Sequence, residues 1–370
     1  MNKIINIVSL DIPYPANYGG VIDIFYKIKA LHLEGYDIHL HCFQYDSKSE
    51  QSELNQYCKS VTYYPRKKNI LSIISIKPFI VYSRRNKTLL KNLLRNKAPI
   101  LFEGIHTTYY LNHSLLENRY KIVRLHNVEQ HYYKALYKSE SSILKKIFFA
   151  IESLKLRCYE KKLHRAQAFL PIAAHDFAFF KSLYPRHTIV LLHAFHPYQD
   201  IQTVSGLGAY CLYHGNLRVQ ENIDAVKFLC TKVFNTLSTP LVIAGKSPHH
   251  TLKNFVSDTI HIIADPSEIE MKNLIQNAQI IVLPTFQTTG MKLKLVESLC
   301  LGRHILVNKN MIIGTTLDKA VHVFENEKDC KQLIQAYIKE PLVQSTLNER
   351  NAFIKDYFPH VQIKKLVELI

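Results

Sequence analysis

The sequence has little of what marks disulfide frameworks, linkers or membrane spans. It contains 11 glycines and 14 prolines in 370 residues, and no stretch is dominated by one residue type, which excludes collagen-like, disordered and linker proteins. Its seven cysteines are scattered without a C-x-x-C pair, which argues against a disulfide framework or a cysteine zinc site. No uncharged apolar run reaches the roughly 18 residues of a membrane span, and residues 1–11 do not resemble a signal peptide. We expect a globular, cytoplasmic protein.

Acidic residues are few relative to basic ones. Lys and Arg number 47 against 30 Asp and Glu, which gives a net charge of +17. Such a field attracts nucleic acid, an anionic membrane or phosphorylated small molecules, although a solvated basic surface without a partner is an alternative. Basic residues cluster at 66–68, at 84–87 and between 145 and 162. The sequence has no zinc-finger, helix-turn-helix or aromatic–basic RNA-binding pattern, so nucleic acid is not an expected partner.

Short apolar runs alternate with helical patterns along the whole chain, as at 21–33 and 222–234. This alternation predicts parallel sheets covered by helices on both faces. The expected strands are 4–10, 38–43, 61–64, 100–102, 122–125, 168–170 and 189–192, then 210–214, 241–244, 260–263, 280–283, 305–307 and 321–324.

The pattern lapses between residues 193 and 209, which predicts a linker. We expect an N-terminal domain over 1–195, a C-terminal domain over 209–355, and a terminal helix over 356–370 that packs back toward the N-terminal domain. The fold class is therefore α/β, with two Rossmann-like, doubly wound domains facing a cleft. Open α/β sheets bind ligands outside the carboxyl ends of their strands, so site residues should directly follow strands.

The most informative segment begins at residue 280 and reads I-I-V-L-P-T-F-Q-T-T-G-M-K-L-K-L-V-E. A buried strand is followed by a polar loop ending in Thr289-Gly290 and then by a helix, whose free N–H groups attract a phosphate. Lys292 and Lys294 add positive charge there, which predicts an anionic ligand. Glu297, about two turns into the helix, could accept hydrogen bonds from a ribose diol; the alternative is a solvated helical glutamate.

This segment resembles the nucleotide-sugar site of retaining glycosyltransferases of family 4, which have the GT-B architecture. The resemblance implies that the domain over 1–195 is the acceptor-side domain and that the domain over 209–355 binds the nucleotide-sugar. Glu297 matches the family's nucleotide-binding glutamate, and residues 299–308 match the leucine, glycine, basic and hydrophobic run that follows it. The phosphate-binding loop is matched by Gly290, Met291, Lys292 and Leu293. Thr289 replaces the glutamate that many members direct at the transferred sugar, so the resemblance leaves the sugar open.

A second stretch, Y-H-G-N-L-R-V-Q-E-N-I-D-A-V, resembles the start of the family's C-terminal domain, although an ordinary strand-to-helix turn is an alternative. Gly215 matches the family's glycine, and Asn216 stands where many members carry an arginine facing the diphosphate. Arg218 and Lys292 are the candidate substitutes.

Two matches lie in the N-terminal half. P-Y-P-A-N-Y-G-G follows the first strand, and in the family this loop, with Gly19 and Gly20, closes on the donor phosphate and the acceptor; a plain tight turn is the alternative. I-V-R-L-H-N-V-E matches the family's H-N-x-E, which places His126 beside the donor sugar as the catalytic candidate, although a lone histidine is more often structural. Glu129 could equally cap the following helix.

The resemblance implies a hexosyltransferase-type glycosyltransferase that moves a sugar, with retention, from a UDP- or GDP-linked donor to a glycan or lipid-linked acceptor. The absence of a D-x-D pattern predicts transfer without a metal, and no cofactor is expected. A bacterial surface-polysaccharide role is implied by the resemblance only. Because of Thr289 and Asn216, a catalytically weak nucleotide-binding scaffold subunit is the alternative, and a sugar-nucleotide epimerase is a third.

The stretch 66–87 combines basic flanks with the apolar run I-L-S-I-I-S-I-K-P-F-I-V-Y. This composition suits peripheral contact with an anionic membrane, at the inner face, or a core segment with solvated ends.

Overall fold

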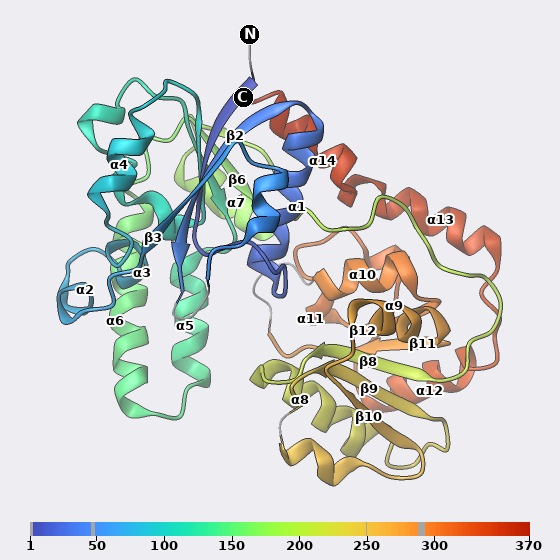
Figure 1. Cartoon of the computed structure of the whole chain (residues 1–370). Coiled ribbons are helices and arrows are strands. Elements are labelled where there is room, and N and C mark those ends of the chain that lie inside the picture. Colours follow the sequence, from blue (N-terminus) through green and yellow to red (C-terminus); the bar gives the residue numbers. More distant parts are fainter. Residues whose placement is uncertain (1–2, 46–48, 249, 288–292) are drawn as a thin grey trace. The chain divides into compact units, whose positions relative to one another are not determined.

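The computed structural model describes residues 3–45, 49–248, 250–287 and 293–370. The chain divides into two compact units (Figure 1). Unit 1 comprises residues 3–197 together with Pro359–Ile370, and unit 2 comprises the described residues from Tyr198 to Phe358. Each unit has one parallel sheet covered by helices, so the predicted α/β class with two Rossmann-like domains is confirmed.

The sheet of unit 1 has the strand order β3-β2-β1-β4-β5-β6-β7, and every neighbouring pair is parallel. The chain winds outward from β1 to β3 and then returns to the other side of β1. The switch point, where such sheets bind ligands, therefore lies between β1 and β4. The bounds are β1 (Lys3–Ser9), β2 (Tyr36–Gln44), β3 (Ser60–Pro65), β4 (Ile100–Glu103), β5 (Lys121–Leu125), β6 (Ala168–Pro171) and β7 (Thr188–Ile189).

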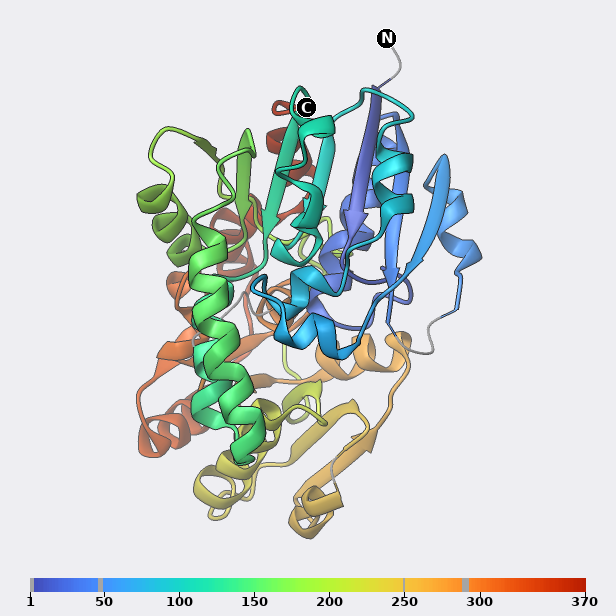
Figure 2. The same ribbon diagram turned by 90° about the vertical axis from the view of Figure 1, so that its left-hand side faces the viewer.

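Alternate side chains of these strands enter two different cores. Ile5 and Ile7 pack with α1 (Gly19–Leu33) and α14 (Pro359–Val367), whereas Val8 and Phe102 face the helices on the other side of the sheet. Figure 2 shows the long helix α6 in front of this sheet and α14 behind it. The helices of that second face are α3 (Phe79–Tyr82), α4 (Lys87–Leu93), α5 (Glu129–Ser139), α6 (Ile143–Glu160) and α7 (Ala174–Leu183).

The terminal helix belongs to the first of these cores. Ile363 and Leu366 of α14 are buried in it, and the side-chain oxygen of Gln362 accepts a hydrogen bond of 2.8 Å from the backbone N–H of His193.

Unit 2 repeats the same winding with the order β10-β9-β8-β11-β12-β13, so its switch point lies between β8 and β11. Its strands are β8 (Cys211–Asn216), β9 (Leu241–Lys246), β10 (Ile260–Ala264), β11 (Ile280–Leu283), β12 (His304–Asn308) and β13 (His322–Phe324). Its helices are α8 (Gln220–Phe228), α9 (Glu268–Asn277), α10 (Leu293–Leu301), α11 (Lys309–Ile312), α12 (Glu327–Tyr337) and α13 (Gln344–Ile354).

Short helical turns complete the two units. They are η1 (Ser52–Gln56), η2 (Ile105–Tyr110), η3 (Ser114–Leu116), η4 (Leu229–Val233), η5 (His250–Phe255), η6 (Asp318–Ala320) and η7 (Lys355–Tyr357).

Close packing fixes two glycines of unit 2. A methyl group on Gly245 would lie 1.9 Å from the carbonyl oxygen of Gly215, so β9 can lie beside the end of β8 only with glycine at 245. A methyl group on Gly302, just after α10, would lie 2.1 Å from Cδ1 of Ile281. The absence of a side chain at these two positions therefore allows close packing against β8 and β11, the two strands at the switch point.

The apolar run at 70–82 forms two short helices with different surroundings. Ile80 and Val81 of α3 are buried, but α2 (Ile70–Ile74) and the loop after it present their large aliphatic side chains to solvent. Interpretation of this run as a core segment is wrong for residues 70–76. In the described ranges, no helix combines the length and the apolar character needed to cross a bilayer.

Candidate active site

Polar side chains gather between α1 and the carboxyl ends of β4 and β5 in unit 1. Lys27 Nζ lies 3.0 Å from Asp23 Oδ2 and 2.7 Å from Glu103 Oε1. Arg124 donates from Nε and Nη2 to the two oxygens of Asp23, each at 3.0 Å. These four side chains are buried and form a network of two carboxylates and two cations, which we call the α1 ion-pair network.

The neighbouring charges decide the protonation of both carboxylates. Burial alone raises the pKa of Asp23, but Arg124, Lys27 and His126 together hold it well below its usual value. Burial likewise raises the pKa of Glu103, and the charge of Lys27 with a hydrogen bond from His126 lowers it below the ordinary value. Both acids are therefore ionised at neutral pH, and the network is electrically balanced.

His126 directly follows β5 and touches this network. Its Nε2 lies 3.3 Å from Glu103 Oε2 and 3.7 Å from Asp23 Oδ2. Because a carboxylate can only accept, His126 donates from Nε2 to Glu103. The side chain is only 10% exposed, so the hydrogen bond to Glu103 fixes the orientation of the ring.

The other ring nitrogen faces the start of α1. A methyl group built on Gly20 would lie 3.6 Å from His126 Nδ1. Helix α1 begins at Gly19, and the first N–H groups of a helix have no intrahelical partner. The structure thus brings together the predicted residues of two separate motifs, namely Gly19 and Gly20 of the first and His126 of the second.

Asp23, Glu103 and His126 each offer a ligand atom within 4.8 Å of one another, which a cation could in principle use. Lys27 and Arg124 already pair with the two carboxylates. A further cation would meet their repulsion at this distance, so the arrangement favours an internal ion-pair network over a metal centre.

In unit 2, Glu297 lies on α10 and is 31% exposed. The hydroxyl of Tyr198 donates to its Oε1 at 2.6 Å, and Oε2 lies 3.6 Å from His214 Nδ1, too far for a hydrogen bond. Burial raises the pKa of Glu297, while the hydrogen bond from Tyr198 opposes this change.

His214 leaves the charge of Glu297 uncompensated. Its Nε2 lies 2.8 Å from Oγ of Ser298, whose hydroxyl donates to the carbonyl of Lys294 at 2.8 Å. The hydroxyl proton is thus used, so Nε2 carries the imidazole proton and Nδ1 presents a lone pair. Burial, together with the charge of Lys294, lowers the pKa of His214 to about 3, so the ring is neutral and Glu297 Oε2 can accept from another donor.

The turn after β8 gathers further predicted residues. Oδ1 of Asn216 accepts from the backbone N–H of Arg218 at 3.1 Å, and the Asn216 carbonyl accepts from Nδ2 of Asn222 at 2.9 Å. A side chain on Gly215 would lie 3.2 Å from that Nδ2. The Arg218 side chain is exposed. Lys294 Nζ donates to Oδ1 of Asn222 at 2.9 Å, so its charge is directed at this turn.

The loop that leads into α10 is described only in part. Thr289, Gly290, Met291 and Lys292 lie outside the described residues, and Leu293 is the half-buried first residue of α10.

Glu129 is the buried first residue of α5. Burial, with the nearby charge of Glu160, raises its pKa to about 8. The candidate helix cap is therefore a buried, largely protonated acid at neutral pH.

Sequence reasoning missed the whole α1 ion-pair network. Arg124 and Glu103 interrupt apolar strand runs, and Asp23 and Lys27 are four residues apart in a mostly apolar helix. Charged residues are almost never fully buried unless paired, so these interruptions were a readable signal. Tyr198 lies in the predicted linker, where nothing pointed to Glu297.

Comparison with known proteins gives this arrangement a context. Residues 208–339 match the family described as Glycosyl transferases group 1. An uncharacterized 44.6 kDa protein in the cps region of Klebsiella pneumoniae is 28% identical over 323 residues, covering 81% of each chain.

Solved structures share the fold at low identity. Sucrose-phosphate synthase from Thermosynechococcus elongatus superposes with a TM-score of 0.70 at 12% identity, covering 99% of this chain and 98% of that one. The Anabaena protein HepE, solved in complex with UDP and glucose, gives 0.65 at 9% identity, with coverage of 99% and 98%. Residues 208–339 are therefore a glycosyl transferases group 1 domain, and the chain is a glycosyltransferase with the GT-B fold.

Proposed function

We propose that the protein transfers a hexose from a UDP- or GDP-linked donor to a glycan or lipid-linked acceptor, with retention and without a metal or other cofactor. The observation that carries the proposal is Glu297. It is a carboxylate on the helix after the switch-point strand β11, with one oxygen held by Tyr198 and the other beside a neutral histidine. A ribose diol supplies the O–H donors that such an oxygen accepts.

The remaining donor contacts are assigned by the same logic. The N-terminus of α10 and its loop, with Thr289, Gly290, Met291, Lys292 and Leu293, are proposed to hold the diphosphate. The positive charge of Lys294, directed at the turn of Gly215, Asn216 and Arg218, supports a contribution of that turn to the same anion. Electrostatic stabilisation of the leaving diphosphate supplies most of the catalysis in this proposal.

In unit 1, His126 is proposed as the residue beside the transferred sugar, with Gly19 and Gly20 as the phosphate and acceptor loop. The hydrogen bond to Glu103 supports this role, since it holds the ring in one orientation. The start of α1 carries free N–H groups and no side chain at two successive positions, which suits a phosphate.

The relative from a cps region supports a place in surface-polysaccharide synthesis. We further propose that the protein acts in the cytoplasm, at the inner face of the membrane, where a lipid-linked acceptor would be within reach.

The test begins with thermal unfolding of the full chain in UDP, GDP, ADP, CDP and TDP, with a chelator present. A ligand specific to the native state stabilises it by about 2.7 kcal/mol at a hundredfold excess over Kd. We expect one nucleoside diphosphate to stabilise the chain and Glu297→Ala to abolish this stabilisation. The control variant Glu327→Ala, on an exposed part of α12, should keep it. Stabilisation by none of them would refute the donor site.

Turnover then separates the enzyme from its alternative. We expect UDP or GDP to be released from the matching nucleotide-hexose only when an acceptor extract is present. His126→Ala should abolish this release. The residues Thr289 and Asn216 favour a second candidate, a nucleotide-binding scaffold. Tight binding without turnover with any acceptor would select that candidate, and conversion of the donor without an acceptor would select an epimerase.

A further inference from the structure

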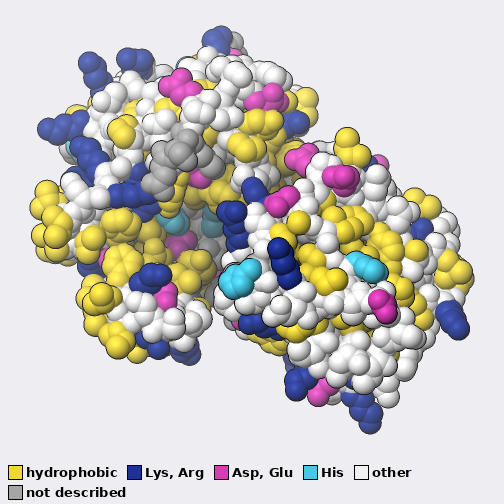
Figure 3. Space-filling view, turned by 60° about the horizontal axis from the view of Figure 1, so that its bottom comes forward, with side chains coloured by type: hydrophobic (Ala, Val, Ile, Leu, Met, Phe, Trp, Pro, Cys, Tyr) yellow, Lys and Arg dark blue, Asp and Glu magenta, His cyan; other side chains and the backbone are white. Residues whose placement is uncertain are grey.

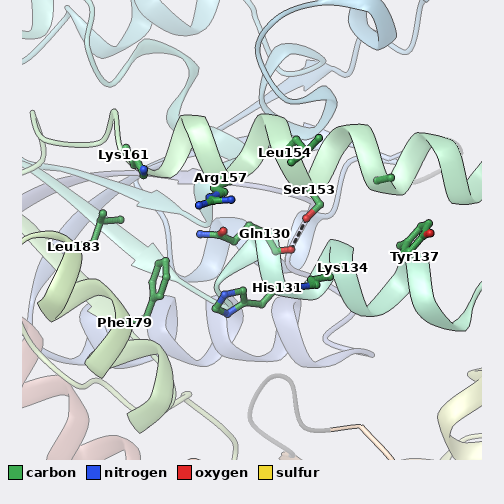
Figure 4. A pocket seen from close by; sticks show the side chains of 11 residues that line it. Gln130, His131, Lys134, Tyr137, Ser153, Leu154, Arg157, Lys161, Phe179 and Leu183 are labelled. Carbon is green, nitrogen blue, oxygen red and sulfur yellow. Dashed lines mark hydrogen bonds between the residues drawn. The ribbon is translucent and has the colours of Figure 1, made fainter.

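A pocket of about 660 Å³ lies between α5, α6 and α7 of unit 1 (Figure 4). Its cationic lining comes from Lys134 of α5 and from Arg157 and Lys161 at the end of α6. In the described part of the chain, no ion pair joins any of these three to an acidic side chain. Leu154, Phe179 and Leu183 form an apolar wall, and the polar side chains of Gln130, His131 and Ser153 also line the pocket. The pocket therefore combines uncompensated positive charge with an apolar wall.

The apolar wall continues onto the outer surface of α6. Five large aliphatic side chains of this helix are between 48% and 81% exposed, namely Ile143, Leu144, Ile147, Ile151 and Leu154. Their spacing places them within one face of a helix with 3.6 residues per turn. Leu154 belongs both to this stripe and to the pocket. The two acidic residues of α6, Glu152 and Glu160, are buried, so the exposed side of α6 carries no negative charge.

Helix α2 extends this apolar surface. Lys155 of α6 donates to the carbonyl of Ile73 at 2.8 Å, which places α2 beside α6. Ile70, Leu71, Ile73, Ile74 and Ile76 are between 48% and 92% exposed. Figure 3 shows apolar side chains of unit 1 gathered here, with Lys and Arg side chains around them. We call the surface of α2 and the exposed side of α6 the α2–α6 face.

Ten exposed aliphatic side chains on neighbouring elements exceed the scattered apolar residues of an ordinary surface. A second copy of the chain is disfavoured as the partner, because the cations of α6 that flank the stripe at helical spacing, such as Lys146 and Arg157, would repel their equivalents. An anionic bilayer satisfies both features, since it takes apolar side chains below its headgroups and cations at headgroup level.

We propose that the α2–α6 face lies on an anionic membrane and that the pocket between α5, α6 and α7 holds the phosphate of one of its lipids. In this arrangement Arg157 and Lys161 bind the phosphate, and the lipid chains leave along Leu154 toward the stripe. The inference does not depend on sugar transfer, because it concerns a different part of unit 1 and its tests measure lipid binding.

The face is tested by flotation of the full chain with vesicles of phosphatidylcholine alone and of phosphatidylcholine mixed with phosphatidylglycerol. We expect binding only to the mixed vesicles and a decrease with added salt. Ile147→Ser/Ile151→Ser should lower the partition coefficient at least about tenfold. Arg157→Ala/Lys161→Ala should lower it about fivefold for each charge.

Matched controls carry the same chemical changes elsewhere. Leu33→Ser/Leu115→Ser removes two exposed leucines of unit 1 outside the face, and Lys227→Ala/Lys232→Ala removes two exposed lysines of unit 2. Both should bind like the unchanged chain. Equal binding to neutral vesicles, or equal losses in the controls, would overturn the proposal. So would a dimer in solution that Ile147→Ser/Ile151→Ser dissociates, because the face would then belong to a second copy.

The pocket is tested with a soluble, short-chain lysophosphatidic acid, measured by thermal unfolding. Ala150 lines the pocket, so Ala150→Tyr fills it without changing charge. We expect saturable stabilisation that inorganic phosphate and a short-chain phosphatidylcholine do not give, and that Ala150→Tyr abolishes. Vesicle binding should weaken in the same variant. If Ala150→Tyr leaves both measurements unchanged, the pocket does not hold a lipid phosphate and that part of the proposal is wrong.

Discussion

Glu297 offers a quantitative test of how the donor is held. The substitution Glu297→Gln keeps the size of the side chain and removes its charge. In the structure, Oε1 already accepts from Tyr198 at 2.6 Å, so Oε2 has the greater capacity to accept from a ribose hydroxyl. Hydrogen bonds to a charged acceptor contribute about 1.5–3 kcal/mol. We therefore expect the affinity for the preferred nucleoside diphosphate to fall about 10- to 100-fold.

The same reasoning predicts a ribose effect that calorimetry can measure. The unchanged chain should bind either the 2′-deoxy or the 3′-deoxy nucleotide more weakly by a similar factor, and Glu297→Gln should bind this analogue and the parent nucleotide equally, because the two changes remove one interaction. Tyr198→Phe, which keeps the charge of Glu297, should preserve the ribose preference, and so should Glu327→Gln. A full ribose preference in Glu297→Gln would refute the assignment.

Three further predictions concern unit 1. Gly20→Ala should raise the free energy of unfolding by up to about 1 kcal/mol, as alanine does in helices. It should also slow transfer about 10- to 100-fold, because the new methyl group lies against His126. Unchanged kinetics would contradict the role of Gly20. Arg124→Met should lower the free energy of unfolding in urea by about 3–5 kcal/mol, because it leaves Asp23 without its main partner. The double variant Asp23→Asn/Arg124→Met should recover part of this loss. A double variant as unstable as the sum of the two single variants would be evidence against the pairing. Burial raises the pKa of Glu129 to about 8, so the folded chain binds more protons than the unfolded one between about pH 4.5 and 8, and stability should fall as the pH rises through this window. Glu129→Gln should reduce this dependence, while Glu160 and Asp176, whose pKa values burial raises to about 7, keep part of it. An unaltered slope would exclude Glu129 as a source.

The strands were predictable because parallel strands buried on both faces read as short apolar runs. All thirteen expected runs coincide with strands, although β7 contains only Thr188–Ile189 where residues 189–192 were expected. Helix starts were less accurate. Helix α8 begins at Gln220 rather than at residue 222, since a hydrogen-bonded turn directly after β8, and no strong cap, sets its start.

The candidate site was predictable where one motif carries it and not where distant segments meet. His126 directly follows β5 and Glu297 lies on the helix after β11, which are the positions that their motifs predicted; their roles stay predictions. The contact of Tyr198 with Glu297 joins residues 99 positions apart, and the bond of Arg124 to Asp23 joins residues 101 apart. The exposure of residues 70–76 was equally hidden, because an apolar run has the same sequence pattern whether tertiary packing covers it or leaves it in water.

The core around α1 is completed by residues from opposite ends of the sequence, and this has a consequence for synthesis on the ribosome. Ile363 and Leu366 cover apolar side chains of α1 that leave the exit tunnel more than 300 residues earlier. Until residues 359–370 emerge, that surface is open and available to chaperones. A fragment ending at residue 197 would keep it open permanently and should aggregate, whereas the same fragment joined by a short linker to residues 359–370 should be soluble.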